Sequence, residues 1–184
     1  RQRQMCIRDR LINGNDEAAA FYRKILGETF AYVQFRIPEI ADELFRVDDA
    51  MKAGFGWEHG PFELWDAVGL TTGIELIKEA GHPVAPWIET LKTKFKSFYK
   101  LEANKKHYYN IGKAEFIPIH GQDAFIILDN VRENKTIWQN KECSIIDIGD
   151  GILNIEFHSK MNTIGAGVLP VSYTHLTLPT IVRV

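Results

Sequence analysis

The chain has 184 residues, 45% of them hydrophobic and 25% charged, and a formal net charge of −2. This composition is ordinary for a soluble globular protein with one domain, or one small domain and part of another. No apolar run approaches the roughly 20 residues of a membrane span. Cys6 and Cys143 form neither a metal-ligand motif nor a disulfide framework. We therefore expect a cytoplasmic protein that does not enter a membrane.

The two ends of the chain differ in composition from its middle. Residues 1–10, RQRQMCIRDR, and 170–184, PVSYTHLTLPTIVRV, resemble peptides translated from sequencing-adapter DNA. We interpret both as artefacts outside the fold; the alternative is a basic arm and a strand-forming tail. Without them the formal charge changes from −2 to −6, because the first ten residues contribute +3 and the tail +1. An acidic body argues against nucleic acid or an anionic membrane as partner.

The first half of the chain has the pattern of a helical bundle. Asn15 or Asp16 can cap a helix that ends at Gly27. From Ile37 to Met51 apolar residues recur at steps of three and four, which predicts a second helix. Pro38 fits in its first turn, where a proline loses no internal hydrogen bond.

The stretch from Met51 to Gly69 is rich in glycine and aromatic residues. A glycine loop precedes a short helix that Pro61 opens and Gly69 ends. Phe62 and Trp65 share one face of this helix. We expect the stretch to fix two helices against each other, with Asp66 capping or bridging a neighbouring helix. The residues of this structural motif are Gly54, Gly56, Gly60, Pro61, Phe62, Trp65, Asp66 and Gly69.

Two more helices complete the predicted bundle. Thr72 to Glu75 has the pattern of a capping box that opens a helix ending near Gly81. Pro86 opens a last short helix.

The composition then changes toward strands. Residues 95–119 are rich in aromatic and β-branched residues, interrupted at 103–105 and at Gly112, which predicts short antiparallel strands. Lysines among these aromatic residues could bind single-stranded nucleic acid by stacking. Aromatic cross-strand pairs account for the pattern without a ligand, and we favour that interpretation.

The last third contains one ambiguous segment and one clear hairpin. Residues 123–133 fit either a buried strand at 125–128 or a short helix capped by Asp123. Residues 143–148 and 152–157 flank Gly149-Asp150-Gly151, a good hairpin signal. The second strand has one apolar and one polar face, and we interpret Glu156 and His158 as its polar side and not as an acid–base pair.

Two groups of motifs resemble known families. Gly54-Phe55-Gly56-Trp57 and the run from Gly60 to Gly69, GPFELWDAVG, resemble the GFG…GPFELxDxxG signature of the C-terminal helical domain of 3-hydroxyacyl-CoA dehydrogenases. Arg36 to Glu43 and Val47 to Met51 extend this match, which covers about residues 15–80. Residues 151–162, GILNIEFHSKMN, are similar to the opening strands and the "MN" step of the enoyl-CoA hydratase (crotonase) family.

The order of these motifs resembles a bifunctional enzyme of fatty-acid β-oxidation, which implies NAD as cofactor and an acyl-CoA as substrate in the parent enzyme. The implied fold is α+β: an all-α helical bundle, a small antiparallel β linker and a truncated β-hairpin start of a crotonase-like domain. The expected segments are an artefact at 1–10, the helical domain at 11–94, a β-rich linker at 95–140, the hydratase hairpin at 141–169 and an artefact at 170–184.

The reacting groups of both activities are missing from the sequence. A dinucleotide site needs a glycine-rich turn after a strand, and Gly165-Ala166-Gly167, followed by Pro170, lacks its third glycine. Related helical repeats have Asn-Arg where this chain has Phe35-Arg36. His59 has no second His or Cys at metal spacing. We therefore predict no catalytic, cofactor-binding or metal-binding residues.

We expect the chain to be an inactive fragment of such a bifunctional enzyme, lacking the dinucleotide-binding and most of the hydratase domain. The alternative is a non-catalytic helical interaction or binding module that shares the repeat.

Overall fold

The computed structural model describes residues 12–159 and 163–169, so the two predicted artefacts and Met161-Asn162 lie outside the described residues. The described chain forms two compact units, which divide between Ile119 and His120. We call them the helical unit and the hairpin unit. The mixture of helices with two small antiparallel sheets confirms the predicted α+β class.

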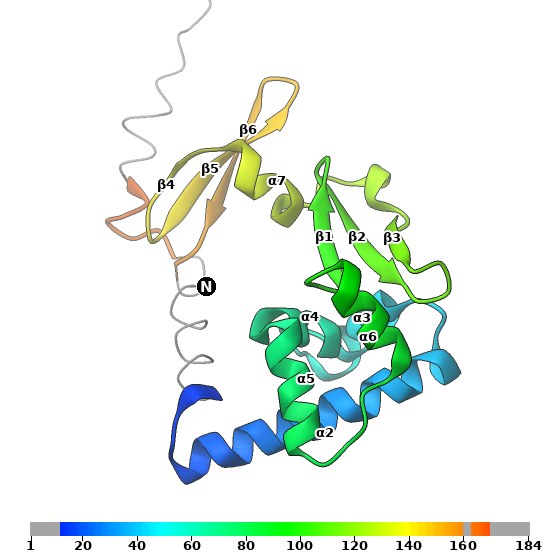
Figure 1. The fold of residues 1–184 in the computed structure, drawn as a ribbon. Coiled ribbons are helices and arrows are strands. Elements are labelled where there is room, and N and C mark those ends of the chain that lie inside the picture. The colour runs from blue at the N-terminus through cyan, green and yellow to red at the C-terminus, as the bar shows by residue number, and fades with distance from the viewer. Residues whose placement is uncertain (1–11, 160–162, 170–184) are drawn as a thin grey trace, which may run out of the picture. The chain divides into compact units, whose positions relative to one another are not determined.

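The helical unit combines five described helices with one three-stranded sheet (Figure 1). The helices are α2 (Glu17–Ile40), α3 (Leu44–Phe55), α4 (Pro61–Val68), α5 (Leu70–Glu79) and α6 (Pro86–Lys94). The strands are β1 (Tyr99–Glu102), β2 (Lys105–Asn110) and β3 (Glu115–Pro118), antiparallel in the order β1-β2-β3. The helices opened by Pro61 and Pro86 and the strands within residues 95–119 are as predicted.

Helix α2 differs from the prediction, because it continues through Gly27 to Ile40. Asp16 caps it as expected, its carboxylate accepting the Ala19 N–H at 2.8 Å. Gly27 is needed for close packing and does not end the helix: a Cβ there would lie 2.5 Å from the main-chain oxygen of Leu76.

Pro38 lies near the end of α2 and not in the first turn of the next helix, so that prediction is also wrong. A proline inside a helix leaves the carbonyl four residues earlier without its usual donor. Here the indole N–H of Trp87 donates to that carbonyl, on Gln34, at 3.0 Å. The Gln34 side chain also bonds to Pro83 and Ala85, which fastens α2 to the segment before α6.

Helix α5 begins directly after Gly69, so the predicted capping box at Thr72 does not open it. Gly69 has φ +103° and joins α4 to α5 without a loop, a conformation that a residue with a Cβ rarely adopts. Gly73 faces Trp65 so closely that a Cβ would lie 2.0 Å from the indole nitrogen. The helix ends just before Gly81, as expected.

Trp65 is the centre of the core of the helical unit. Its ring stacks on Phe30 of α2 at 4.8 Å and meets the edge of Phe98 at 5.0 Å. Its N–H donates to the carbonyl of Leu70 at 3.3 Å, so no polar atom of the ring is left unpaired.

The small sheet belongs to this same core. Tyr108 and Tyr109 of β2 are buried among the helices, and Tyr108 packs on Phe45 of α3. The two compact units divide between Ile119 and His120, whereas the composition changes at 94/95 and 140/141. Aromatic side chains of residues 95–119 complete the helical core, so this segment is not an independent linker.

The hairpin unit contains η1 (Gln122–Ala124), α7 (Leu128–Lys135), β4 (Thr136–Gln139), β5 (Cys143–Gly149) and β6 (Ile152–Phe157). Its strands are antiparallel in the order β4-β5-β6, and the turn at residues 149–151 confirms the predicted hairpin. In the ambiguous segment the helix alternative is right, although the helix begins after Ile127, which occupies the N-cap position expected for Asp123. Phe125 and Ile126 are exposed, which excludes the buried strand.

We predict that Trp65→Ala lowers the free energy of unfolding by about 3–5 kcal/mol, because a fully buried ring is replaced by a cavity. Trp57, which is 41% exposed, provides the control: Trp57→Ala is expected to cost less than about 1 kcal/mol. Urea denaturation of the full chain, followed by circular dichroism, measures both. Equal midpoints for the two variants would contradict the central role of Trp65.

Candidate functional site

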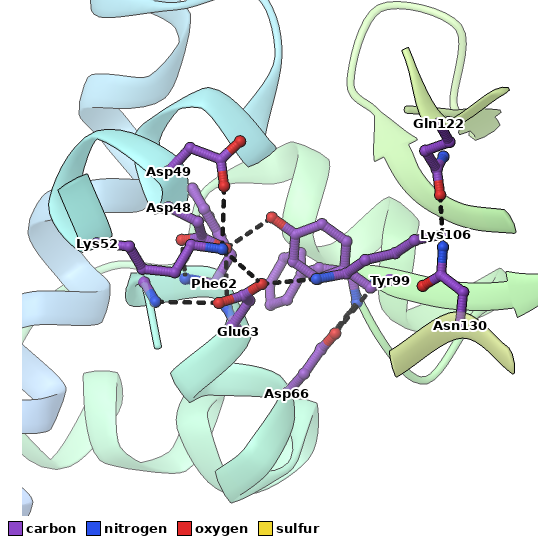
Figure 2. Close-up of polar contacts among 12 residues, drawn as sticks. Asp48, Asp49, Lys52, Phe62, Glu63, Asp66, Tyr99, Lys106, Gln122 and Asn130 are labelled. Carbon is purple, nitrogen blue, oxygen red and sulfur yellow. Dashed lines mark hydrogen bonds and ion pairs between the residues drawn. The ribbon is translucent and has the colours of Figure 1, made fainter. Parts of the chain in front are cut away.

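Three acidic side chains of α3 and α4 surround Tyr99 at the start of β1 (Figure 2). Asp48 of α3 is buried, and its carboxylate accepts the N–H groups of Phe62 at 2.8 Å and Glu63 at 3.0 Å. These N–H groups open α4 and have no partner within the helix. Asp48 therefore caps α4 from a neighbouring helix.

Gly60 makes this distant cap possible. A Cβ at Gly60 would lie 2.2 Å from the Cα of Asp48, so only glycine allows the two segments to approach this closely. Pro61 then occupies the first helical position, where no N–H is needed. The Gly-Pro pair thus brings the start of α4 against the carboxylate of Asp48.

Glu63 completes the start of α4 and joins it to other elements. Its carboxylate accepts the Gly60 N–H at 3.2 Å and pairs with Lys52 at 3.1 Å and Lys106 at 2.6 Å. Partial burial disfavours its ionised form, but the hydrogen bonds and charges of the two lysines outweigh burial and hold the pKa of Glu63 below its usual value.

Asp66 binds the main chain where the sheet begins. Its carboxylate accepts the Phe98 N–H at 2.8 Å and the Tyr99 N–H at 2.9 Å. The Tyr99 hydroxyl donates to Asp48 at 2.6 Å, so Tyr99 is held by one carboxylate at each end (Figure 2). Asp66 therefore bridges to a strand and not to the neighbouring helix that we expected.

Burial controls the ionisation of both aspartates. Loss of hydration raises the pKa of Asp48 to about 6 and that of Asp66 to about 7, although the hydrogen bonds to each carboxylate act in the opposite direction. Values near neutrality also occur in general bases. Here the carboxylates face main-chain N–H groups and a tyrosine, so the arrangement joins α3, α4 and β1.

The other motif residues have structural places in the same region. Gly54 lies inside α3, and Gly56, with φ +65°, ends that helix. Phe62 and Trp65 are fully buried. Sequence reasoning missed Asp48, although it lies four residues after the apolar Leu44 and therefore on the buried side of α3. An acid on that side, followed by a Gly-Pro helix start, was the available signal.

Among the described residues no group of three His, Cys, Asp or Glu side chains is placed to hold a metal ion. Phe35 is on the surface of α2, where Arg36 pairs with Glu39 at 2.7 Å.

Glu156 lies in β6 and His158 directly follows this strand, with 3.9 Å between the imidazole Nε2 and the Oε2 of Glu156. Arg132 of α7 binds the Glu156 carboxylate through two nitrogens. The same Nε2 of His158 lies 2.9 Å from the hydroxyl of Ser144, a residue that is fully buried. This cluster joins α7, β5 and β6; its serine is not accessible to a substrate.

Gly165-Ala166-Gly167 does not fit the pyrophosphate of a dinucleotide. The Gly167 N–H already donates to the Glu142 carboxylate at 2.9 Å. A carboxylate at this position repels a phosphate, and the amide that would bind the phosphate is occupied.

In the part of the chain that the structure describes, every helix is too short or too polar to cross a membrane.

Comparisons with known proteins match part of the chain to one family. Residues 23–110 match the family model of the 3-hydroxyacyl-CoA dehydrogenase C-terminal domain. The match lies within the helical unit and includes β1 and β2 as well as the helices. No solved structure matches the chain.

Two curated proteins that the chain resembles are much longer than the chain. A Bacillus subtilis protein described as "Probable 3-hydroxyacyl-CoA dehydrogenase" is 36% identical over 168 residues, covering 90% of this chain and 21% of its own length. A Rickettsia felis protein described as "Putative fatty acid oxidation complex trifunctional enzyme" is 27% identical over 127 residues, covering 68% of this chain and 17% of its own. The chain thus spans about a fifth of the relatives it matches. An alignment over 90% of the chain includes residues of both units.

We predict that stability falls as the pH rises from about 4 to about 7. Asp48 and Asp66 have folded-state pKa values of about 6 and 7 and an ordinary value of 3.8, so the folded state binds protons more tightly through this range. Denaturant midpoints measured between pH 4.5 and 8 test this.

Asp66→Asn removes one of the titrating groups, so it is expected to flatten the pH dependence. Asp49→Asn, at an exposed position, is the control and keeps the slope of the unmodified chain. A slope that Asp66→Asn leaves unchanged would show that Asp66 does not titrate in this range.

Proposed function

We propose that this chain is part of a bifunctional 3-hydroxyacyl-CoA dehydrogenase and enoyl-CoA hydratase of fatty-acid β-oxidation, and that it contributes a structural helical domain. The observation that carries the proposal is the set of contacts made by the acidic residues in the motifs. Asp48, Glu63 and Asp66 bind main-chain N–H groups, lysines and Tyr99, which joins helices to the sheet. Their positions support architecture and not proton transfer to a substrate.

The proposal assigns the chemistry to other domains of the parent enzyme. NAD would bind a dinucleotide-binding domain, and the acyl-CoA substrate would react there and in the hydratase domain. The hydrogen bond from the Gly167 N–H to the Glu142 carboxylate supports leaving the turn at residues 165–167 out of the NAD site. Phe35, which has no hydrogen-bonding group in its side chain, stands where related repeats have an asparagine.

The hydratase assignment rests on the hairpin unit. The β5–β6 hairpin occupies the segment that resembles the start of an enoyl-CoA hydratase. The Bacillus subtilis relative aligns over 90% of the chain, which supports the two units occurring together in one longer protein. A cytoplasmic location is part of the same proposal.

A chimeric enzyme tests the structural role. The matching region of the Bacillus subtilis relative is replaced by this chain, and dehydrogenase activity is measured with a 3-hydroxyacyl-CoA and NAD. The unmodified relative is assayed first for the dehydrogenase activity in its description. We expect the chimera to retain the activity of this starting protein. A second chimera carrying Trp65→Ala should yield less folded enzyme, with kcat per folded molecule unchanged. A folded chimera without activity would contradict the proposal.

The isolated chain is expected to be inactive. We predict no reduction of NAD with a 3-hydroxyacyl-CoA and no hydration of an enoyl-CoA above the background without protein, because neither reacting centre is present. Absorbance assays at the NADH and enoyl thioester bands measure this, with the Bacillus subtilis relative as positive control. Turnover by the isolated chain would reveal a site that we have misplaced.

The alternative, a non-catalytic helical interaction module, is favoured by one observation. Helix α2 exposes several large apolar side chains on one face. A chimera that folds but has no dehydrogenase activity would favour this alternative.

A further inference from the structure

The peptide bond between Asn13 and Gly14 lies just before α2, in the segment that leads to the Asp16 cap. It is the only Asn-Gly pair in the sequence. Asn13 is exposed, so water reaches its side chain, and Gly14 has no Cβ to shield its main-chain nitrogen. A side-chain amide in this position can react with the main-chain nitrogen that follows it.

Arg23 of α2 holds the main chain on both sides of Asn13. Its Nη1 donates to the carbonyl of Ile12 at 2.9 Å and to the carbonyl of Gly14 at 2.7 Å. Asn13 has a helical backbone, which turns the Gly14 nitrogen away from the Asn13 side chain. Ile12 is buried in the core of the helical unit, so the segment is also fixed on its other side.

We propose that Asn13 is a deamidation site and that Arg23 controls the rate of its reaction. The Gly14 nitrogen attacks the Cγ atom of Asn13, and its proton passes through water to the side-chain nitrogen, which leaves as ammonia. The cyclic imide then takes up one water molecule. It opens at either carbonyl, which gives isoaspartate or aspartate at position 13.

The two hydrogen bonds of Arg23 oppose ring closure. The ring closes only after rotation about the Cα–C bond of Asn13, which brings the Gly14 nitrogen toward Cγ. This rotation moves the Gly14 carbonyl relative to the Ile12 carbonyl, so both cannot keep hydrogen-bond distance to one Arg23 nitrogen. Because the donor is charged, these hydrogen bonds are strong, and breaking one of them slows the reaction.

The isoaspartate product changes this segment permanently. It adds one carbon to the main chain between Ile12 and Gly14, and the two carbonyls then no longer fit the same nitrogen of Arg23. Ile12 loses its fixed place in the core, and the start of α2 loosens. This inference is independent of the proposed function, because it concerns only the segment before α2.

Peptide mapping by mass spectrometry tests the site on the full chain, after incubation for several days at mildly alkaline pH. A glutamate-specific protease at slightly acidic pH keeps the cleavage sites the same in all variants. The peptide that contains Asn13 should gain the mass difference between an amide and an acid, and an isoaspartate-specific methyltransferase should label it. Gly14→Ala leaves Arg23 in place, shields the attacking nitrogen with a Cβ and should slow the reaction many-fold.

Two matched variants test the role of Arg23. Arg23→Gln should deamidate several-fold faster than the unmodified chain, with unchanged helical circular dichroism. Lys24→Gln removes the same charge from the next, exposed position and should react at the unmodified rate. An Asn13 peptide that gains no isoaspartate would overturn the proposed site. Equal rates for Arg23→Gln and Lys24→Gln would overturn the control by Arg23.

Discussion

The capping of α4 by Asp48 is the interaction on which the helical unit depends. It satisfies two N–H groups at the start of a helix that would otherwise be buried without partners. It also fixes the position of α4, which places Trp65 in the core and directs Asp66 toward β1. Tyr99 closes the arrangement, since its hydroxyl binds Asp48 and its N–H binds Asp66. Helix position, core packing and sheet attachment thus follow from one cluster of buried carboxylates.

Features that depend on neighbouring residues could be predicted from the sequence. Pro61 and Gly69 mark the ends of α4, and the aromatic segment after residue 95 forms strands, because proline, glycine and β-branched residues restrict the backbone locally. Gly27 and Pro38 could not be interpreted in this way. Their roles depend on the carbonyl of Leu76 and the indole of Trp87, which lie about fifty residues further along the chain.

The candidate site could likewise be predicted only where neighbouring residues determine it. The sequence identifies Asp66 as an acid within a distinctive motif, and a capping or bridging role was a reasonable expectation. Its partners are the N–H groups of Phe98 and Tyr99, more than thirty residues away, and no local pattern indicates them. Asp48 was missed for a related reason. Helix α3 is rich in charged residues. Only the face that Asp48 shares with the apolar Leu44 distinguishes this buried acid from the solvated ones.

The boundary of the helical domain follows from the core and not from the composition. Phe98, Tyr108 and Tyr109 are buried in the helical core, so a chain ending at residue 94 would expose the faces of α3, α4 and α6 that they cover. Asp66 would also keep a buried carboxylate without its N–H donors, which costs more than the hydrogen bonds contribute when they are made. The family match, which extends to residue 110, includes these side chains. The smallest segment that satisfies both the apolar core and the buried carboxylates therefore includes β1 and β2, and it ends at Ile119 if β3 is kept paired.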